Sequence, residues 1–517
     1  MKKNLSFIIC HLSFSVALIL TACQQAKVPD SYTESAEQAA IYPDYRDVTV
    51  PVNIAPLHFE LTNNADEAVT RFSGGGAEIV CDGVKAMPSI DDWRELTAKT
   101  KGDKITVEVF ARQQDQWKRY KPFNIYVSPD SIDPWLSYRL ISPSYVTFEE
   151  LTINQRCLEN YDEQVIYNNM LCSSEEDGQC INCHNYQRGN PRRMQFHARL
   201  SHGGTMICYD GQMKKVNLKN DSTISAGVYP AWHPTLPLIA YSTNSTMQMF
   251  HIRDLNKIEV LDSRSDLVLY DIENNEVSNV EARKDEFEIF PHWSPDGQYL
   301  YYGSAHFEKD DTISDESAAI FRYKDIKYSI YRKRFDAQTK TFGEREMVFD
   351  AAERGLSATL PRVSPDGRWL LLSVGEWGCF HIWHRDADLW LVDLQDFERR
   401  TEGSEPTQSF ARPFTEVNSP DVEAYHTWST SGRWIVFSSR RDDGNYTRPF
   451  FAHIDKDGHA TKPFELPAED PDYHRQLLKS YNIPELMTGP VTVTPQQFAD
   501  ALKQDATPAK FANYNTK

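Results

Sequence analysis

A short segment that recurs four times between residues 232 and 438 constrains the fold more than any other feature. The copies begin at Trp232, Trp293, Val363 and Trp428, and each runs into a strongly apolar stretch. Three of them carry Asp-Gly or Ser-Gly at a turn position. Glycine accepts the positive φ that tight hairpin turns need, so these copies predict a turn followed by a strand. Four such copies indicate a repeat architecture built from β-hairpins.

These segments resemble the repeats of TolB-type β-propellers, and the resemblance covers roughly residues 205–465. Successive copies lie 61, 70 and 65 residues apart, whereas one propeller blade takes about 40 to 45 residues. Either some blades lack the signature or long loops are inserted. The polar stretches 266–288, 306–316 and 399–423 are candidates for such loops. We expect about six blades.

The pentapeptide Cys180-Ile-Asn-Cys183-His184 has the form C-x-x-C-H. Two thiols at this spacing can each form a thioether with a vinyl group of haem, and the adjacent histidine can bind the iron. The motif therefore predicts one covalent haem c. Three alternatives stay open: a thioredoxin-like redox pair, a zinc or iron–sulfur site that recruits Cys157 and Cys172, and a plain disulfide.

The ligand on the other side of the iron is predicted only as a set of candidates. Met206 and His202 lead, because Gly203-Gly204 beside them lets the backbone approach a haem closely, and Met194 and His197 follow. A local basic cluster suits the haem propionates, and its members are Arg188, Arg192, Arg193 and Arg199. Five further cysteines leave disulfide pairing open, with Cys157–Cys172 the first pair to test, and they are Cys81, Cys157, Cys172, Cys208 and Cys379.

The N-terminus predicts export and a lipid anchor. Lys2 and Lys3 precede an apolar run that ends in Leu20-Thr21-Ala22-Cys23, which resembles the lipobox of bacterial lipoproteins. We expect a signal peptide over residues 1–22 and lipidation of Cys23; the alternative is an ordinary signal peptide cut elsewhere. The expected location is the cell envelope, on the periplasmic side of either membrane or at the cell surface. A net charge of −19 argues against nucleic acid as a partner.

The remaining segments predict a mainly all-β chain with a few helical pieces. Residues 23–44 read as a polar tether, and alternating apolar residues such as Val48, Val50 and Val52 predict a β-sandwich over residues 45–140. Loosely helical spacing from Glu149 to Met170 predicts a short helical insert in the haem segment, residues 141–210. The propeller is expected over residues 211–470 and a helical tail over residues 471–517, with Thr494 as an N-cap.

Lipobox, β-domain, C-x-x-C-H motif and repeats together resemble a group of Bacteroidetes lipoproteins loosely labelled TolB-like or cytochrome c biosynthesis proteins. The resemblance implies a propeller and haem attachment at Cys180, Cys183 and His184. The favoured function is a tethered monohaem electron carrier that docks a redox or envelope protein. One alternative is an interaction scaffold with a structural metal or disulfide. The other is a haem or metal enzyme that uses the propeller channel.

No Gly-x-Ser-x-Gly hydrolase elbow occurs, and no catalytic residue is predicted. If the channel held an enzyme site, histidines within the repeats are the candidates to line it: His233, His251, His292, His381, His384 and His426.

Overall fold

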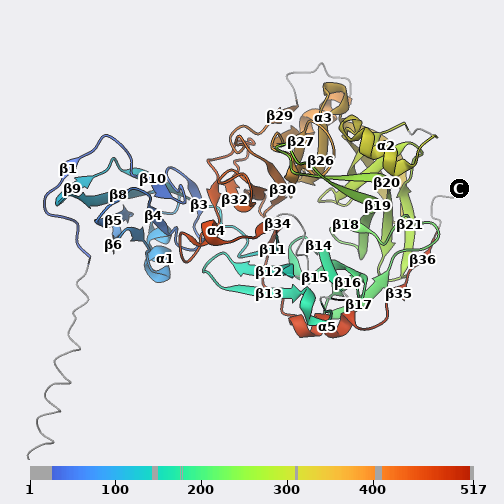
Figure 1. Cartoon of the computed structure of the whole chain (residues 1–517), viewed down its shortest axis with the longest axis horizontal. Helices are drawn as coiled ribbons and strands as arrows, with labels where there is room; N and C mark the ends of the chain where they lie inside the picture. Colours follow the sequence, from blue (N-terminus) through green and yellow to red (C-terminus); the bar gives the residue numbers. More distant parts are fainter. Residues whose placement is uncertain are drawn as a thin grey trace, which may run out of the picture.

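The computed structural model describes residues 26–142, 150–174, 176, 178–308, 312–401 and 410–512. The predicted signal peptide and the lipidation site at Cys23 lie outside these residues. The described chain is mainly β (Figure 1). None of its helices combines the length and the apolar character that a bilayer crossing requires.

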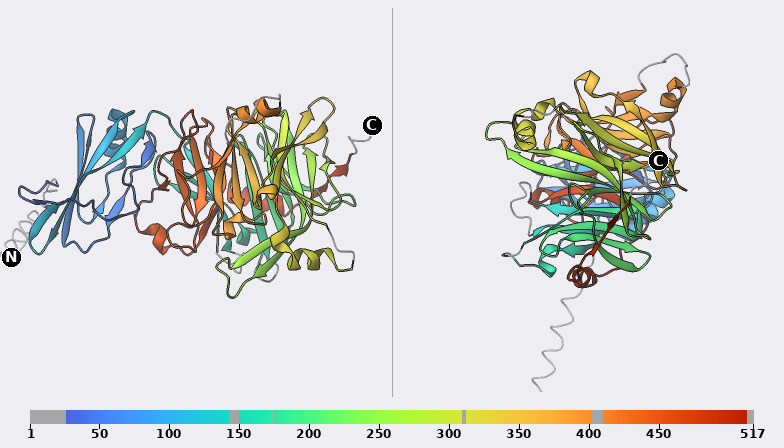
Figure 2. Two further views of the ribbon diagram at one scale, coloured as in Figure 1. Left: turned by 90° about the horizontal axis from the view of Figure 1, so that it is seen from above. Right: turned by 90° about the vertical axis from the view of Figure 1, so that its right-hand side faces the viewer.

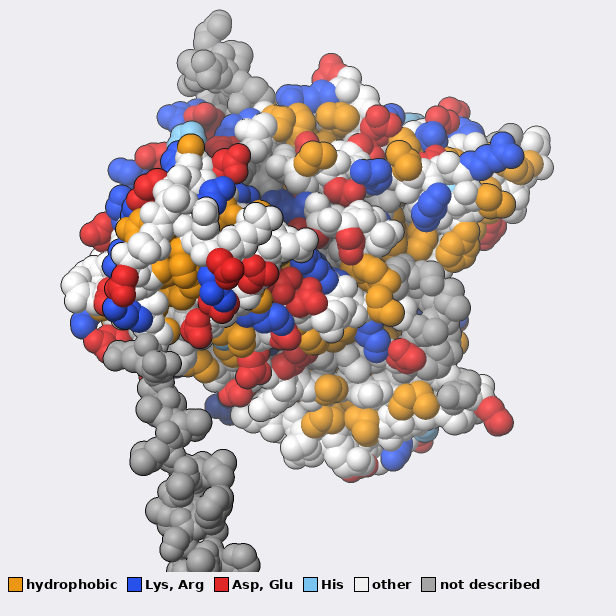
Figure 3. Space-filling model, turned by 60° about the vertical axis from the view of Figure 1, so that its left-hand side comes forward, with side chains coloured by type: hydrophobic (Ala, Val, Ile, Leu, Met, Phe, Trp, Pro, Cys, Tyr) orange, Lys and Arg blue, Asp and Glu red, His pale blue; other side chains and the backbone are white. Residues whose placement is uncertain are grey.

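The N-terminal part forms a β-rich domain, as predicted, but it begins at β1, so part of the segment 23–44 that was predicted as a tether belongs to the folded domain. Its main sheet has the order β1-β9-β8-β10-β3, with β5 and β6 added at β8, and β2, β4 and β7 form a second sheet. The helix α1 (Ile90–Lys99) begins at Ser89, whose side chain accepts a hydrogen bond from the backbone of Asp92, and it buries Trp93. Acidic and basic side chains intermingle on the outer face of this domain (Figure 3).

The strands of this domain are short at its edges and longer at its centre. The main sheet contains β1 (Thr33–Glu34), β3 (Thr49–Pro51), β5 (Glu67–Gly74), β6 (Ala77–Asp82), β8 (Lys104–Gln113), β9 (Gln116–Arg119) and β10 (Phe123–Ser128). The second sheet contains β2 (Ile41–Tyr42), β4 (Phe59–Leu61) and β7 (Lys85–Ala86).

Residues 135–487 form six four-stranded antiparallel units, which we call sheets I to VI. Sheet I holds β34 (Ser480–Met487), β11 (Trp135–Ile141), β12 (Thr152–Cys157) and β13 (Glu163–Asn168). Sheet II holds β14 (Gln179–Gln187), β15 (Asn190–Leu200), β16 (Gly204–Tyr209) and β17 (Gln212–Asn217). Sheet III holds β18 (Val228–Trp232), β19 (Leu238–Phe250), β20 (Ile258–Asp271) and β21 (Glu276–Glu281).

The last three units follow the same order. Sheet IV holds β22 (Glu286–Trp293), β23 (Tyr299–His306), β24 (Ser329–Asp336) and β25 (Thr341–Phe349). Sheet V holds β26 (Ser357–Val363), β27 (Trp369–Gly375), β28 (Asp388–Asp393) and β29 (Ala411–Pro413). Sheet VI holds β30 (Glu423–Trp428), β31 (Trp434–Ser439), β32 (Arg448–His453) and β33 (Phe464–Glu465). The edge strands β35 (Thr507–Pro508) and β36 (Lys510–Phe511) join β17 and β21.

The six units follow one another in a ring (Figure 1). Their first strands are β34, β14, β18, β22, β26 and β30, and each contacts the next; β30 in turn contacts β34. Because β34 comes from the C-terminal region and pairs with β11, sheet I combines two distant parts of the chain. The N-terminal domain lies beside this ring (Figure 2) and shares a hydrophobic cluster with sheet VI through residues such as Trp434 and Phe451.

Each first strand carries the same backbone irregularity. A register shift places two of its residues opposite one residue of the neighbouring strand, which is a β-bulge. The first bulge residue has a left-handed φ of 50° to 56° at every site: Cys183, Tyr229, Phe290, Leu360, Tyr425 and Ile483. The second bulge residue is His184, Pro230, Pro291, Pro361, His426 or Pro484. The ring is thus one structural unit repeated six times.

The predicted signature has a clear structural role in sheets III to VI. The indole Nε1 of Trp293 donates a hydrogen bond to the carbonyl of Ala231 at 3.1 Å, and that of Trp428 donates to Arg362 at 3.0 Å. Each of these bonds joins one first strand to the first strand before it. The following turn is closed by serine, since the Tyr299 backbone donates to Ser294 Oγ at 2.9 Å. The predicted hairpins are therefore confirmed.

One helical prediction was wrong and another was confirmed in part. The segment from Glu149 to Met170 forms β12 and β13, and only Asn169–Leu171 forms a 3₁₀ turn. Leu151, Ile153, Ile166 and Tyr167 are buried in the cluster shared by sheets I and II, so their spacing reflects the packing of strands. The C-terminal tail contains α4 (Tyr473–Gln476) and α5 (Pro495–Leu502), with the predicted cap at Thr494, but β34 lies between them.

The predicted domain boundaries also change. The repeated sheets begin at β11 and end at β34, so they include the segment assigned to a separate haem insert. Residues 266–288, predicted as an inserted loop, lie largely in β20, β21 and β22. Within 306–316 the helix α2 (Asp315–Phe321) begins. Within 399–423 the helix α3 (Leu394–Thr401) ends and β29 follows, while residues 402–409 lie outside the described residues.

Candidate functional site

The inside of the ring is a cavity of about 690 Å³. This volume lies in the range of small-molecule and cofactor sites. The first bulge residues of all six first strands line it, and so do the residues two positions further along each strand: Asn185, Ala231, His292, Arg362, Thr427 and Glu485. The cavity is therefore built by the repeat itself, and the six strands differ only in the side chains they contribute.

Sheet II contributes the predicted haem motif to this cavity. Cys180, Cys183 and His184 all line it. In a regular strand, side chains at positions 180 and 183 point to opposite faces. The bulge that begins at Cys183, with φ of 56°, breaks this alternation. The structure thus brings together the three residues that the sequence grouped by spacing alone.

His184 is buried and chemically available. Its side chain is 2% exposed, and among the described residues neither ring nitrogen has a hydrogen-bonding partner. Burial, together with the Arg139 guanidinium, lowers the pKa of His184 to about 3, against a weaker opposing effect of the Ile483 backbone. The imidazole is therefore neutral at physiological pH, which is the form that binds metals. Burial also raises the pKa of the Cys183 thiol.

The cavity is strongly basic for so acidic a chain. Its charged lining residues are Arg139, Arg188, Arg199 and Arg362, with Glu485 as the acid among them. Glu485 accepts hydrogen bonds from Asn185 Nδ2 at 2.9 Å and from the Tyr186 backbone at 3.1 Å. Burial raises its pKa to about 7. Such a site attracts anions, because a cavity with low-dielectric walls focuses the field of its charges.

Only part of the predicted basic cluster reaches the cavity. Arg188 and Arg199 line it. Arg193 forms an ion pair with Asp210 at 2.6 Å, and Arg192 is exposed at the surface. Arg139 and Arg362 were not predicted. They line the cavity because β11 and β26, which carry them, border it.

None of the four predicted candidates for the other iron ligand lines the cavity. Met194 and Met206 are fully buried in the hydrophobic cluster between sheets I and II, near Phe196. The Nδ1 atom of His197 lies 3.0 Å from Thr205 Oγ1, in the interior of sheet II. His202 lies in the turn between β15 and β16. The structure does not bring these residues together with His184.

The seven cysteines that the structure describes are all free thiols. Cys157 and Cys172, the first candidate pair for a disulfide, are therefore not bridged. Cys157 lies on β12, whereas the sulfur of Cys172 lies 2.9 Å from the hydroxyl of Tyr167. Across the described residues, no group of three or more His, Cys, Asp or Glu side chains forms a metal-binding cluster. Recruitment of Cys157 and Cys172 to a zinc site with the motif finds no support in this arrangement.

The histidines of the repeats separate into different environments. His292 lines the cavity, and His426 is close enough to influence its pKa. His233 accepts hydrogen bonds from the turn that follows it, and His251 contacts the ring of Tyr323. His381 and His384 lie in a second buried cluster, where His384 Nε2 is 3.1 Å from the carboxylate of Glu259.

An extended hairpin of sheet III contributes to one end of the cavity. The strands β19 and β20 project from one face of the ring (Figure 2), and their residues Thr246, Gln248 and Val260 join the lining. Glu259 on this hairpin accepts a hydrogen bond from Trp377 Nε1 at 2.9 Å. That bond and the Glu259–His384 contact attach the hairpin to the segment after β27.

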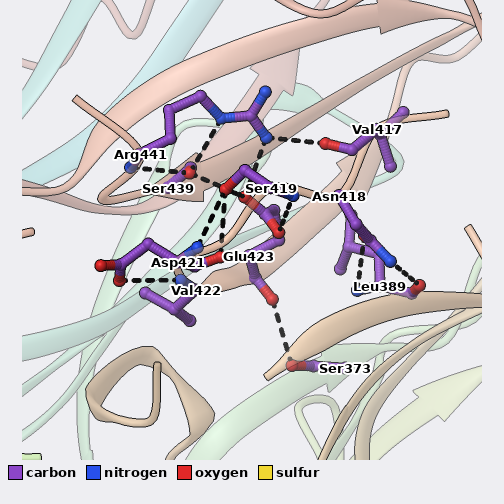
Figure 4. A network of polar contacts seen from close by, with 10 residues as sticks. All are labelled: Ser373, Leu389, Val417, Asn418, Ser419, Asp421, Val422, Glu423, Ser439 and Arg441. Carbon is purple, nitrogen blue, oxygen red and sulfur yellow. Dashed lines mark hydrogen bonds and ion pairs between the residues drawn. The ribbon is translucent and has the colours of Figure 1, made fainter. Parts of the chain in front are cut away.

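Two buried glutamates occupy equivalent positions, each two residues before a bulge. Glu423 in sheet VI is surrounded by donors: its carboxylate accepts from Ser419 at 2.6 Å, Ser439 at 2.9 Å and Arg441 at 2.9 Å (Figure 4). Glu288 in sheet IV is equally buried, but neither carboxylate oxygen has a hydrogen-bonding partner among the described residues. Burial raises the pKa of Glu288 to about 9, and Asp266 adds to the shift.

No protein-family model and no curated protein matches the sequence. A solved structure from a study of two prolyl endopeptidases matches at 13% identity and a TM-score of 0.34, over 65% of this chain and 42% of that one. Prolyl oligopeptidase B from Galerina marginata matches at 10% identity and 0.34, over 83% and 54%. The β-propeller domain of Cps50 (Swd1) from Myceliophteria thermophila matches at 10% identity and 0.27, over 66% and 91%.

The chain spans about half of the length of the prolyl peptidases it matches. All three TM-scores are below 0.5.

Proposed function

We propose that sheets I to VI are the blades of a six-bladed β-propeller that β34 closes. The support is the circle of contacts between first strands and the bulge repeated in each. In this arrangement sheet I takes its first strand from the C-terminal region, which joins the two ends of the ring. The TolB-like resemblance of the repeats fits the same architecture.

We further propose that the chain is a c-type haem protein of the cell envelope that carries electrons. Cys180 and Cys183 form the thioethers, and His184 binds the iron. The observation that carries this proposal is that all three line one cavity while, across the part of the chain that the structure describes, neither nitrogen of the buried His184 has a hydrogen-bonding partner in good geometry, the Ile483 backbone lying near enough to raise its pKa slightly. An unpaired buried polar group costs about 1 to 3 kcal/mol, so a bound metal accounts for its presence.

The residues around the motif suit a haem. Arg139 and Arg199 line the cavity and can pair with the propionates through charge-assisted hydrogen bonds. Tyr229, Phe290 and Leu360 present apolar surface to the same space, which excludes water and so adjusts the reduction potential. When bound, haem supplies one-electron redox chemistry. The chain's own residues hold it, keep the His184 imidazole neutral and balance the charge.

The envelope location is part of the same proposal, with the anchor at Cys23 and a redox or envelope protein as partner. The lipobox-like residues before Cys23 support it. Labelling of growing cells with an alkyne fatty acid tests the anchor. The full chain should become labelled, whereas Cys23→Ser should not; equal labelling of both would contradict the anchor.

Absorption spectroscopy tests the haem. The full chain, produced together with a cytochrome c maturation system, should show a Soret band that survives denaturation. The double substitution Cys180→Ser/Cys183→Ser should abolish the band, and the matched substitution Cys208→Ser, at a buried cysteine away from the cavity, should retain it. Absence of the band from the unsubstituted chain would leave the motif as a redox or structural thiol pair on an interaction scaffold.

A further inference from the structure

Sheets IV and V place two nitrogen-rich side chains at equivalent positions in the cavity. His292 on β22 and Arg362 on β26 each lie two residues after the first bulge residue, and both line the cavity. Since β22 and β26 are in contact, the two residues are neighbours. Sheet V lies three places around the ring from sheet II and sheet IV lies two places from it, so Arg362 faces the cavity from the side opposite Cys183, with His292 beside it.

Among the described residues, Arg362 lacks the direct carboxylate partner that several other arginines in this protein have, although the charge of Glu485 acts on it and opposes the lowering of its pKa. Arg441 pairs with Glu423, and Arg332 pairs with Glu346 and Glu398. Arg362 instead donates to the carbonyl of the adjacent Pro361 at 2.8 Å, and across the described residues it forms no ion pair. Burial lowers its pKa to about 10, so the guanidinium still carries its charge at neutral pH. A charge in such a cavity is stabilised when an anion binds to it.

His292 complements that guanidinium. Burial, and then the nearby Arg362 and His426, hold the pKa of His292 well below its usual range. A neutral imidazole donates one hydrogen bond without adding charge. The hydroxyl of Thr427, on the next first strand, donates to the Pro484 carbonyl at 3.0 Å and so adds no further donor. The remaining N–H groups of the Arg362 guanidinium and the N–H of His292 are the donors offered to one oxyanion.

The walls around this pair are aromatic. Phe290, Trp293, Tyr425 and Trp428 line the cavity on the same side of the ring. Aromatic faces contribute apolar contact area, which an inorganic ion cannot use and an organic body can. The polar groups fix the acid group, and the walls accommodate the rest of the molecule.

We propose that Arg362 and His292 bind the carboxylate of a small organic acid with an apolar body, at a position separate from the Cys180–His184 motif. The site goes beyond the proposed haem attachment and does not depend on it. Because the two positions lie on opposite sides of one cavity, the acid is either a substrate of the redox centre or a ligand that the propeller carries alone.

Titration calorimetry with benzoate and with inorganic phosphate tests the proposal. Both are titrated into the mature full-length chain, produced with and without the maturation system. Benzoate should bind, and Arg362→Met should weaken its affinity by about tenfold or more. Arg354→Met, at an exposed arginine, is the matched control and should bind like the unsubstituted chain. Glu485→Gln removes the acid from the cavity lining and should bind benzoate at least as tightly.

Three results would overturn the proposal: no binding of either anion, equal benzoate affinity in Arg362→Met, or phosphate binding without benzoate binding. Arg362→Lys keeps the charge and should retain part of the affinity, which distinguishes a lost contact from a misfolded variant. The haem proposal fails separately, because it is tested by the Soret band, while the anion titration is also made on haem-free protein.

Discussion

The first strand of sheet II and those of the other five sheets share one backbone and differ in what the bulge presents. In sheets I, III, IV and V an apolar residue is followed by proline, which has no ring donor or acceptor to satisfy. In sheet VI the second residue is His426, whose Nε2 bonds to the Leu371 carbonyl at 3.1 Å. Among the described residues, only sheet II places there a cysteine followed by an imidazole with neither ring nitrogen hydrogen-bonded. The other five bulges form without a Cys-His pair. The pair in sheet II is therefore explained by the proposed haem and not by the needs of the fold.

Replacing the bulge of sheet II with that of sheet V gives the largest expected effect. Cys183→Leu/His184→Pro should abolish covalent haem entirely. The fold should persist, with stability unchanged or increased by about 1 to 2 kcal/mol in haem-free protein, because an unsatisfied buried imidazole is removed. Urea denaturation and the Soret band measure the two effects. Loss of folding would show that the bulge of sheet II cannot accept the Leu-Pro sequence that forms the bulge of sheet V.

Substitution of the two equivalent glutamates, Glu423 and Glu288, should give the next largest effects, which are changes in stability. Glu423→Gln leaves the partly buried Arg441 beside a neutral amide, and it should destabilise the protein by about 3 kcal/mol. Urea denaturation at pH 7 measures the change. Serine-to-alanine substitution at Ser439, which removes one donor of the same network, should cost less. An effect of Glu423→Gln below that of Ser439→Ala would contradict the ion pair's role.

Glu288→Gln should act in the opposite direction and depend on pH. The folded state keeps the Glu288 proton up to a pKa of about 9, whereas the unfolded chain loses it near the ordinary glutamate pKa of 4.5. The stability that this group contributes is therefore present below pH 4.5 and is lost as pH rises toward 9. The variant should be more stable than the unsubstituted chain at pH 8, on the order of 2 kcal/mol, and nearly equal at pH 4.5. A constant difference across this range would indicate that Glu288 has a partner.

The smallest effect concerns the tryptophans of the repeat. Trp293→Phe removes the bond to Ala231 that joins two first strands, whereas Trp232 has no partner for its Nε1 among the described residues. Trp293→Phe should therefore cost about 1 kcal/mol more than Trp232→Phe. Thermal denaturation of the two variants measures the difference. Equal losses of stability in the two variants would show that packing of the tryptophan ring, and not its hydrogen bond, stabilises the repeat.

The sequence predicted the hairpins of sheets III to VI because Trp-Ser-Pro-Asp-Gly and its variants describe a turn, and turns are local. Sheets I and II were missed because they lack that turn. A second pattern was present in all six first strands: an apolar residue or cysteine, then proline or histidine, as in Phe290-Pro291 and Cys183-His184. This pattern marks the bulge, and it would also have located β34.

The candidate site was predicted in part. The spacing of Cys180, Cys183 and His184 was sufficient to group them, because one bulge in one strand brings them together. Arg139, Arg362 and Glu485 reach the cavity from sheets I and V, and only the closed order of the sheets places them there. Met206 and His202 were predicted because Gly203-Gly204 beside them lets the backbone approach a haem closely, but β16 and the turn before it place them away from the cavity lining.

Peptide mapping by mass spectrometry tests the central claim most directly. The chain is purified from cells with an active cytochrome c maturation system and digested under denaturing conditions. The account predicts that the peptide containing Cys180-Ile-Asn-Cys183-His184 carries the mass of one haem, and that peptides containing Cys81, Cys157, Cys172, Cys208 and Cys379 do not. A motif peptide recovered with two free or mutually bridged thiols, and without haem, would contradict the account.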